Sequence, residues 1–217
     1  MFFPTTSSPQ PFLRSHIFMD MDWIHHLERG SGDLTLLLLH GTGGNEKQLL
    51  ELGRQVAPTA NLLGVRGRSL DEGFPRYFRR FSATEYDQAQ IASEADALAQ
   101  FVGDAAQNYG LDPAKVVALG YSNGANIALA TLLRQPKALA GAALLRPVMP
   151  LDEPPAPDLA GLPVMLLHGA HDPYAPHGQN VGPLLRELGA NLTERRLNAG
   201  HELSGQDVQL LQEWLAK

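Results

Sequence analysis

The sequence predicts an α/β fold, with a mostly parallel central sheet and helices on both of its faces. Short apolar runs of strand length alternate along the chain with longer segments whose apolar residues recur at helical spacing. One run passes directly into Gly-Tyr-Ser-Asn-Gly and then into a helical pattern, at residues 116–128. Several runs end in polar residues, and parallel strands bring such ends to one edge of the sheet, where ligands bind.

The chain is expected to form one domain behind a short extension. Its 217 residues, 44% of them hydrophobic, are enough for one sizeable core. Residues 1–15 are rich in proline, serine and threonine, so they are expected to be flexible, which leaves 16–217 as the domain. No signal peptide is apparent, and the strongest apolar run, Leu34–Leu39, is too short to cross a membrane. We therefore expect a cytoplasmic protein that does not insert into membranes.

The first half of the chain supplies three strands and two helices. Strands are expected over residues 23–27, 34–39 and 60–65, and helices over 46–56 and 85–109. The run at 34–39 is apolar on both faces, as in a central parallel strand. The run at 23–27 fits an edge strand. Gly110 supplies a stop for the long second helix.

The second half continues the alternation. Strands are expected over residues 116–121, 138–145, 164–167 and 191–197, and helices from 122 to the residues before Pro136, over 177–189 and over 205–216. Four prolines within residues 151–163 indicate an ordered surface loop rather than a linker between domains.

Ser122 stands at the centre of Gly-Tyr-Ser-Asn-Gly. A strand that turns into a helix within about one residue holds such a serine in a strained conformation with its hydroxyl exposed. Gly120 and Gly124 leave room for the close approach of the strand and the helix. A structural corner that merely needs two glycines would give the same pentapeptide, so the interpretation depends on the rest of the chain.

Asp172 and His201 are the candidate acid and base. Each follows a predicted strand, and the chain order Ser, Asp, His is that of the α/β hydrolases. A serine hydroxyl is a poor nucleophile and needs a base, whose tautomer a carboxylate fixes. His171 and His177 are alternative bases, but they follow the same strand as Asp172 and are poorly placed to reach Ser122.

Four motifs carry a resemblance to a known family. They are His40-Gly41-Thr42-Gly43-Gly44, Gly120-Tyr121-Ser122-Asn123-Gly124-Ala125, His168-Gly169-Ala170-His171-Asp172-Pro173 and Gly200-His201-Glu202. Over about residues 30–217 the chain resembles the phospholipase/carboxylesterase family, a compact and nearly lidless branch of the α/β hydrolases near the dienelactone hydrolases. The resemblance implies Ser122, Asp172 and His201 as nucleophile, acid and base. It also implies an oxyanion hole made by the backbone N–H groups of Thr42 and Asn123.

Two departures from neighbouring families narrow the expected activity. The nucleophile is a serine where dienelactone hydrolases have a cysteine, which argues against their lactone chemistry. Residues 146–150, Arg-Pro-Val-Met-Pro, differ from the Ser-Gly segment of acyl-protein thioesterases, which weakens a thioesterase assignment.

The loop over residues 64–81 carries five arginines and only two carboxylates. It is either a solvated loop whose arginines pair with carboxylates, or a cationic rim that favours anionic or polar esters. Arg79 is our candidate for substrate contact from this rim, together with its neighbours Arg76 and Arg80. Gly43, Phe78 and Met149 are further candidates for substrate contact, the latter two as the apolar wall of an acyl pocket.

Together these features predict a serine carboxylesterase that hydrolyses small carboxylic esters, anionic or aromatic ones included, through an acyl-enzyme. The net charge of −6 argues against nucleic acid as a partner, and the absence of cysteine excludes thiolate metal sites. No cofactor is implied, and residues 168–177 lack a recognised metal-ligand spacing, so no metal is expected. An acyl-thioesterase or lysophospholipase of the same fold, or a non-catalytic binding protein on a hydrolase scaffold, remains an alternative. Assembly into a homodimer also stays open.

Overall fold

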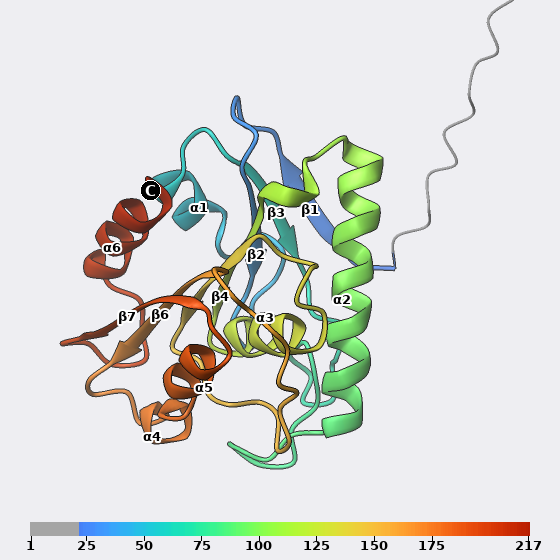
Figure 1. Cartoon of the computed structure of the whole chain (residues 1–217). Helices are drawn as coiled ribbons and strands as arrows, with labels where there is room; N and C mark the ends of the chain where they lie inside the picture. Colours follow the sequence, from blue (N-terminus) through green and yellow to red (C-terminus); the bar gives the residue numbers. More distant parts are fainter. Residues whose placement is uncertain (1–21) are drawn as a thin grey trace, which may run out of the picture.

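The computed structural model describes residues 22–217; the predicted extension at residues 1–15 lies outside the described residues. The described strands form one sheet in the order β1-β3-β2-β4-β5-β6-β7 (Figure 1). They are β1 (His25–Glu28), β2 (Thr35–Leu39), β3 (Asn61–Val65), β4 (Val116–Tyr121), β5 (Gly141–Leu145), β6 (Pro163–Gly169) and β7 (Asn191–Leu197). The edge strand β1 is antiparallel to β3, and every other pair is parallel. The predicted α/β fold is confirmed.

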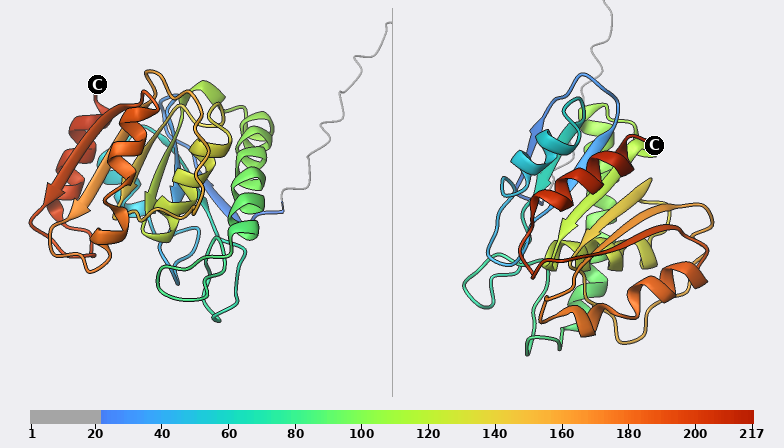
Figure 2. Two further views of the ribbon diagram at one scale, coloured as in Figure 1. Left: turned by 60° about the horizontal axis from the view of Figure 1, so that its bottom comes forward. Right: turned by 90° about the vertical axis from the view of Figure 1, so that its left-hand side faces the viewer.

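Helices cover both faces of the sheet (Figures 1 and 2). They are α1 (Leu50–Val56), α2 (Gln88–Tyr109), α3 (Asn123–Arg134), α4 (Ala175–Gly178), α5 (Val181–Glu187) and α6 (Gly205–Leu215), with a 3₁₀ turn at Pro113–Lys115. Helices α2, α3 and α5 pack on one face, and α1 and α6 on the other. Within residues 22–217, no helix combines the length and apolar character needed to cross a membrane.

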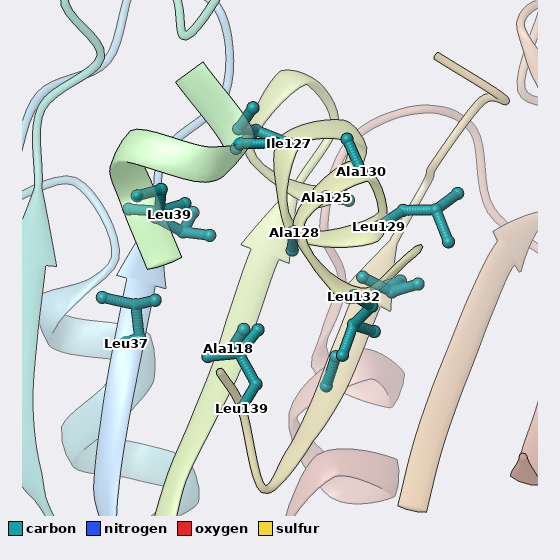
Figure 3. Packing of buried hydrophobic residues seen from close by; sticks show 14 of the residues in the cluster. Leu37, Leu39, Ala118, Ala125, Ile127, Ala128, Leu129, Ala130, Leu132 and Leu139 are labelled. Carbon is teal, nitrogen blue, oxygen red and sulfur yellow. The ribbon is translucent and has the colours of Figure 1, made fainter. Parts of the chain in front are cut away.

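The central strand β2 shows why this arrangement is stable. All five of its residues are buried, and its leucines divide between the two faces of the sheet. Leu37 and Leu39 pack toward α3, whose residues between Asn123 and Leu133 are all buried (Figure 3). Leu36 and Leu38 pack on the side of α1 and α6. Burial on both faces keeps β2 inside the sheet, between β3 and β4, and so places its carboxyl end beside that of β4 at the edge where ligands bind.

Two helix predictions were wrong in extent. The helix expected over 46–56 begins at Leu50, because residues 45–50 form tighter turns in which Gln48 N–H donates to Asn45 and Leu50 N–H to Lys47. The helix expected over 177–189 is two short helices, α4 and α5. A continuous helix would place Pro183 in its interior, without an N–H and against a preceding carbonyl, whereas a new start at Val181 puts this proline in the first turn.

Candidate active site

Ser122 lies at the turn from β4 into α3, in a backbone conformation that few side chains adopt. Its φ is 53° and its ψ is −115°, outside the common regions for a non-glycine residue. The neighbouring glycines are required there: a Cβ on Gly120 would lie 2.5 Å from the Gly124 carbonyl oxygen, and one on Gly124 would lie 1.9 Å from that of Leu39. The strain predicted from the pentapeptide is therefore present at Ser122.

Ser122, His201 and Asp172, which were expected to act together, lie in contact in the structure. His201 Nε2 lies 2.9 Å from Ser122 Oγ, and His201 Nδ1 lies 2.8 Å from Asp172 Oδ2. Asp172 is buried and also accepts the backbone N–H of Tyr174 at its other oxygen. With Nδ1–H directed at the carboxylate, Nε2 presents its lone pair to the serine hydroxyl.

Two tyrosines hold the imidazole of His201 in place. The ring of Tyr174 meets it edge-on at 5.1 Å between centroids, and the centroid of the Tyr121 ring lies 5.5 Å away. The Tyr121 hydroxyl donates to the His201 carbonyl. Burial, with the nearby charge of Glu202, raises the pKa of Tyr121 to about 12, so this donor stays protonated across the neutral range.

Arg146, the residue after β5, fixes the loop that carries His201. Its guanidinium donates to the carbonyl of Gly200 at 3.0 Å and to that of Glu202 at 3.2 Å, on either side of the histidine. The same group forms a two-point ion pair with Asp207, in which neither side chain is exposed. Asp207 in turn accepts the N–H and hydroxyl of Ser204 at the start of α6. Sequence reasoning missed both residues of this pair.

Thr42 and Asn123 lie at the position expected of an oxyanion hole. Both line the cavity above Ser122, and the hydrogen bonds of the described loops and helix ends include none donated by either backbone N–H. The Asn123 side chain accepts the N–H of Tyr77, and the Thr42 hydroxyl accepts a hydrogen bond from Arg76 Nη1 at 2.7 Å. Within residues 22–217 these two backbone donors are available beside the nucleophile, as an oxyanion hole requires.

The cavity at this site has a volume of about 340 Å³. Arginines, tyrosines and asparagines dominate its wall, and Ala83 and Val148 are its aliphatic residues. Its lining comprises Thr42, Arg76, Arg80, Ala83, Tyr86, Tyr121, Ser122, Asn123, Asn126, Arg146, Val148, Tyr174, His201 and Glu202. The size suits a small ligand, and the wall suits a polar one.

Of the candidates Gly43, Phe78, Arg79 and Met149, the last three lie away from this cavity. Phe78 is fully buried and stacks edge-on behind Tyr86, whose ring faces the cavity in its place. Met149 packs against the core on the α2 and α3 side. Arg79 is directed outward and pairs with Asp71 at 3.1 Å. Gly43 lines a shallow depression next to the cavity, which also includes Thr42, Glu72, Phe74 and Arg80.

The five arginines of the loop divide between the two interpretations. Arg66 pairs with Glu46, Arg68 with Glu94 and Arg79 with Asp71, all outside the cavity. Arg76 and Arg80 line the cavity with Ser122. The rim is therefore cationic at two positions, Arg76 and Arg80, whereas Arg79 pairs with Asp71 outside the cavity.

Two further histidines, His40 and His168, are buried in structural surroundings. His40 is buried, and its Nε2 accepts the Gly67 N–H, so Nδ1–H donates to the Gly41 carbonyl. His168 is buried beside Glu194. Burial lowers the pKa of both imidazoles. At His168 the Glu194 carboxylate opposes this effect but does not cancel it. In the described part of the chain, no group of three or more histidine or acidic side chains is arranged to hold a metal ion.

The sequence pattern of the phospholipase/carboxylesterase family matches residues 28–217, which include every residue of the site. The chain belongs to this family. Solved structures of two carboxylesterases share its architecture. The Bacillus cereus carboxylesterase superposes with a TM-score of 0.87 at 37% identity, over 90% of this chain and 94% of its own. A carboxylesterase from Mesorhizobium loti gives 0.87 at 38% identity, over 91% and 96%.

A curated relative agrees with this assignment. MhqD of Bacillus subtilis, a protein named as a hydrolase, is 40% identical over 192 residues, which is 88% of this chain and 96% of that protein. Membership of the phospholipase/carboxylesterase family makes this chain an α/β hydrolase of the carboxylesterase class.

Proposed function

We propose that this hydrolase is a serine carboxylesterase, with Ser122 as nucleophile, His201 as general base and Asp172 as the acid that orients the base. The observation that carries the proposal is the unbroken chain of short contacts from Ser122 Oγ through His201 to Asp172, at the cavity wall. A serine alone reacts slowly, and this arrangement supplies the base and the fixed tautomer that it needs.

The acylation step follows from these contacts. Ser122 Oγ attacks the ester carbonyl carbon as its proton passes to His201 Nε2, and the carbonyl oxygen becomes an oxyanion facing the N–H groups of Thr42 and Asn123. When the tetrahedral intermediate collapses, the bond to the alcohol oxygen breaks and His201 returns its proton to that oxygen. The acyl group then remains as an ester on Ser122.

Deacylation repeats the same sequence with water. His201 accepts a proton from the water, whose oxygen attacks the acyl carbon, and the proton then passes to Ser122 Oγ as the bond to serine breaks. The carboxylic acid leaves and the enzyme is regenerated. Asp172 stays ionised throughout and stabilises the imidazolium that forms at each step.

The cavity favours the binding of short acyl groups over long ones. A volume of about 340 Å³ and a wall with few aliphatic side chains offer little apolar surface to a fatty acyl chain. This composition favours a small-ester carboxylesterase over the lysophospholipase and long-chain thioesterase alternatives. A series of 4-nitrophenyl esters and thioesters from two to twelve carbons is expected to give the highest kcat/KM among the short oxygen esters.

Labelling with a fluorophosphonate tests the serine mechanism directly. The probe reacts only with an activated serine, so wild type should become labelled and Ser122→Ala should not. His177→Gln, which alters an exposed histidine outside the cavity, should label like wild type. An unlabelled wild-type chain that still binds esters would instead indicate a binding protein on a hydrolase scaffold.

A further inference from the structure

The cavity contains two cations from the long loop between β3 and α2, and both lie close to the reacting serine. Arg76 and Arg80 line the same wall as Ser122 and Thr42. The Arg76 side chain is only 4% exposed, and that of Arg80 is 30% exposed. A nearly buried guanidinium is costly unless an anion accompanies it.

The described residues supply these two arginines with a single carboxylate. Glu72 lies 2.8 Å from Arg80 and 4.0 Å from Arg76. The hydrogen bonds of Arg76 go to neutral acceptors, the Phe78 carbonyl from Nε and the Thr42 hydroxyl from Nη1. Its Nη2 donates to no acceptor in the described part of the chain. One guanidinium edge is therefore left for a ligand.

The remaining charges of the cavity do not neutralise this pair. Arg146 is matched by Asp207, and Asp172 lies outside the cavity wall, where its carboxylate accepts from His201 and the Tyr174 N–H. The charge of Glu202 interacts with Tyr121, beside the histidine. The charges of Arg76 and Arg80 interact instead with Tyr86 and Tyr174. Burial lowers the pKa of Arg76, and repulsion from Arg80 outweighs the attraction of Glu72, as expected where two cations share one anion.

We propose that Arg76 and Arg80 form a carboxylate subsite, and that the preferred substrates are esters whose short acyl group ends in a carboxylate, that is, monoesters of small dicarboxylic acids. Guanidinium groups bind carboxylates through paired, charge-assisted hydrogen bonds. The inference rests on the proposed esterase function and adds the substrate class to it.

The geometry assigns the carboxylate to the acyl group rather than to the alcohol. Arg76 donates a hydrogen bond to the hydroxyl of Thr42, whose N–H is one of the two proposed oxyanion donors. The alcohol oxygen must lie against His201, which protonates it as it leaves. The acyl chain is the part of the ester that remains free to extend toward the arginines. The cavity's volume of about 340 Å³ suits an acyl chain of a few carbons.

Matched substrates test this proposal. Monoethyl glutarate carries a terminal carboxylate, and ethyl glutaramate has a neutral amide of nearly the same shape in its place. Wild type should hydrolyse the first with a kcat/KM about tenfold or more above the second, measured by ethanol release. Acetoxyacetate and acetoxyacetamide place the same two groups on the alcohol side and should differ by much less. Equal values for the glutaric pair, or a preference confined to the alcohol-side pair, would overturn the proposal.

Variants locate the effect. Arg80→Gln should lower the ratio of the two glutaric kcat/KM values about tenfold, and Arg80→Lys should retain part of it, because a lysine keeps the charge without the paired geometry. Arg79→Gln is the matched control, since Arg79 is the next residue along but pairs with Asp71 outside the cavity. An equal loss in Arg79→Gln would mean that the general charge of the loop, and not this subsite, sets the preference.

A binding measurement separates this inference from the esterase proposal. Calorimetry on the Ser122→Ala chain should detect glutarate binding, weakened about tenfold by Arg80→Gln in the same background. Fluorophosphonate labelling and ethyl glutaramate hydrolysis report on the catalytic serine alone. An enzyme that is labelled and hydrolyses the amide ester, but neither prefers monoethyl glutarate nor binds glutarate, refutes the subsite and leaves the esterase assignment intact.

Discussion

Arg146 and Asp207 form a fully buried two-point ion pair, with Nη1–Oδ1 at 2.7 Å and Nη2–Oδ2 at 2.9 Å, that joins the end of β5 to the start of α6. The loop with His201 connects β7 to α6, and Arg146 donates to the carbonyls of the residues on either side of the histidine. Arg146 itself has a φ of 54°, so the backbone is strained to bring the guanidinium to this place. The pair acts as a positioning device for the imidazole.

Breaking the pair should cost stability. In Asp207→Ala, Arg146 stays buried as an unpaired charge, and the free energy of unfolding in urea should fall by about 3–5 kcal/mol. The double variant Arg146→Met/Asp207→Leu replaces both groups by apolar side chains and should recover much of that loss. It leaves the Gly200 and Glu202 carbonyls without their donors, so kcat should stay about tenfold or more below wild type. Full recovery of kcat together with stability would show that the pair serves folding alone.

Ser122 and His201 should be indispensable for turnover. Ser122→Ala and His201→Ala are each expected to lower kcat by about 10⁴–10⁶, because the members of such a set act as a unit. Both variants should keep the wild-type unfolding midpoint within a few tenths of a molar urea, so that the loss is chemical. His177→Ala is the control, since His177 is exposed and lies outside the cavity. If His177→Ala were the inactive variant, the base would be wrongly assigned.

The residues brought together at Ser122 could be placed from the sequence because each follows a parallel strand. Ser122 follows β4, Asp172 follows β6 and His201 follows β7, and the register of a parallel sheet brings these ends to one edge. Local pattern alone gives the order of the strands along the chain and the polar residue at each end. That is enough to predict the fold and these three positions.

The pocket wall depends on contacts that no local pattern contains. From sequence alone, an aromatic residue in a loop fits a pocket wall or a core equally well. Phe78 lies in the core because Tyr86 packs between it and the cavity. Arg79 and Arg80 are adjacent, and the bridge between Arg80 and Tyr86 decides which one faces the cavity. Arg146 and Asp207 are 61 residues apart. Their signals were an arginine directly after an apolar strand and an aspartate three residues after Ser204, the spacing of a capping box.

The backbone N–H of Thr42 should matter more for turnover than its side chain. Thr42→Ala removes the acceptor of Arg76 Nη1 but keeps the N–H, so its effect on the kcat for a neutral ester should stay within about tenfold. Thr42→Pro removes the N–H and should lower kcat by about 10² or more, the usual cost of one oxyanion-hole donor. Circular dichroism checks that both variants fold. Equal effects of the two changes in folded protein would assign the oxyanion to other donors.

His40 should make the protein less stable as the pH falls through the range of histidine titration. Its Nε2 accepts the Gly67 N–H, and a second proton on the ring would place two N–H groups against each other. Burial accordingly lowers the pKa of His40, and that of His168, below the value of about 6.5 for an unfolded chain. Between the folded and the unfolded pKa the unfolded chain binds more protons, so the free energy of unfolding falls as the pH drops below about 6.5.

Urea unfolding at pH 7.5 and pH 5.5 measures this effect in a pH range where the carboxylates do not titrate. The pKa values of paired acids such as Glu46 and Asp96 are lowered by Arg66 and Arg134, so their contribution is lost only below about pH 4.5. Each unit by which burial lowers the pKa of His40 contributes about 1.4 kcal/mol to the full change. His40→Gln keeps an acceptor without the titration and should flatten the pH dependence, whereas His177→Gln should leave it as in wild type. A His40→Gln variant with the wild-type slope would assign the acid sensitivity to other groups.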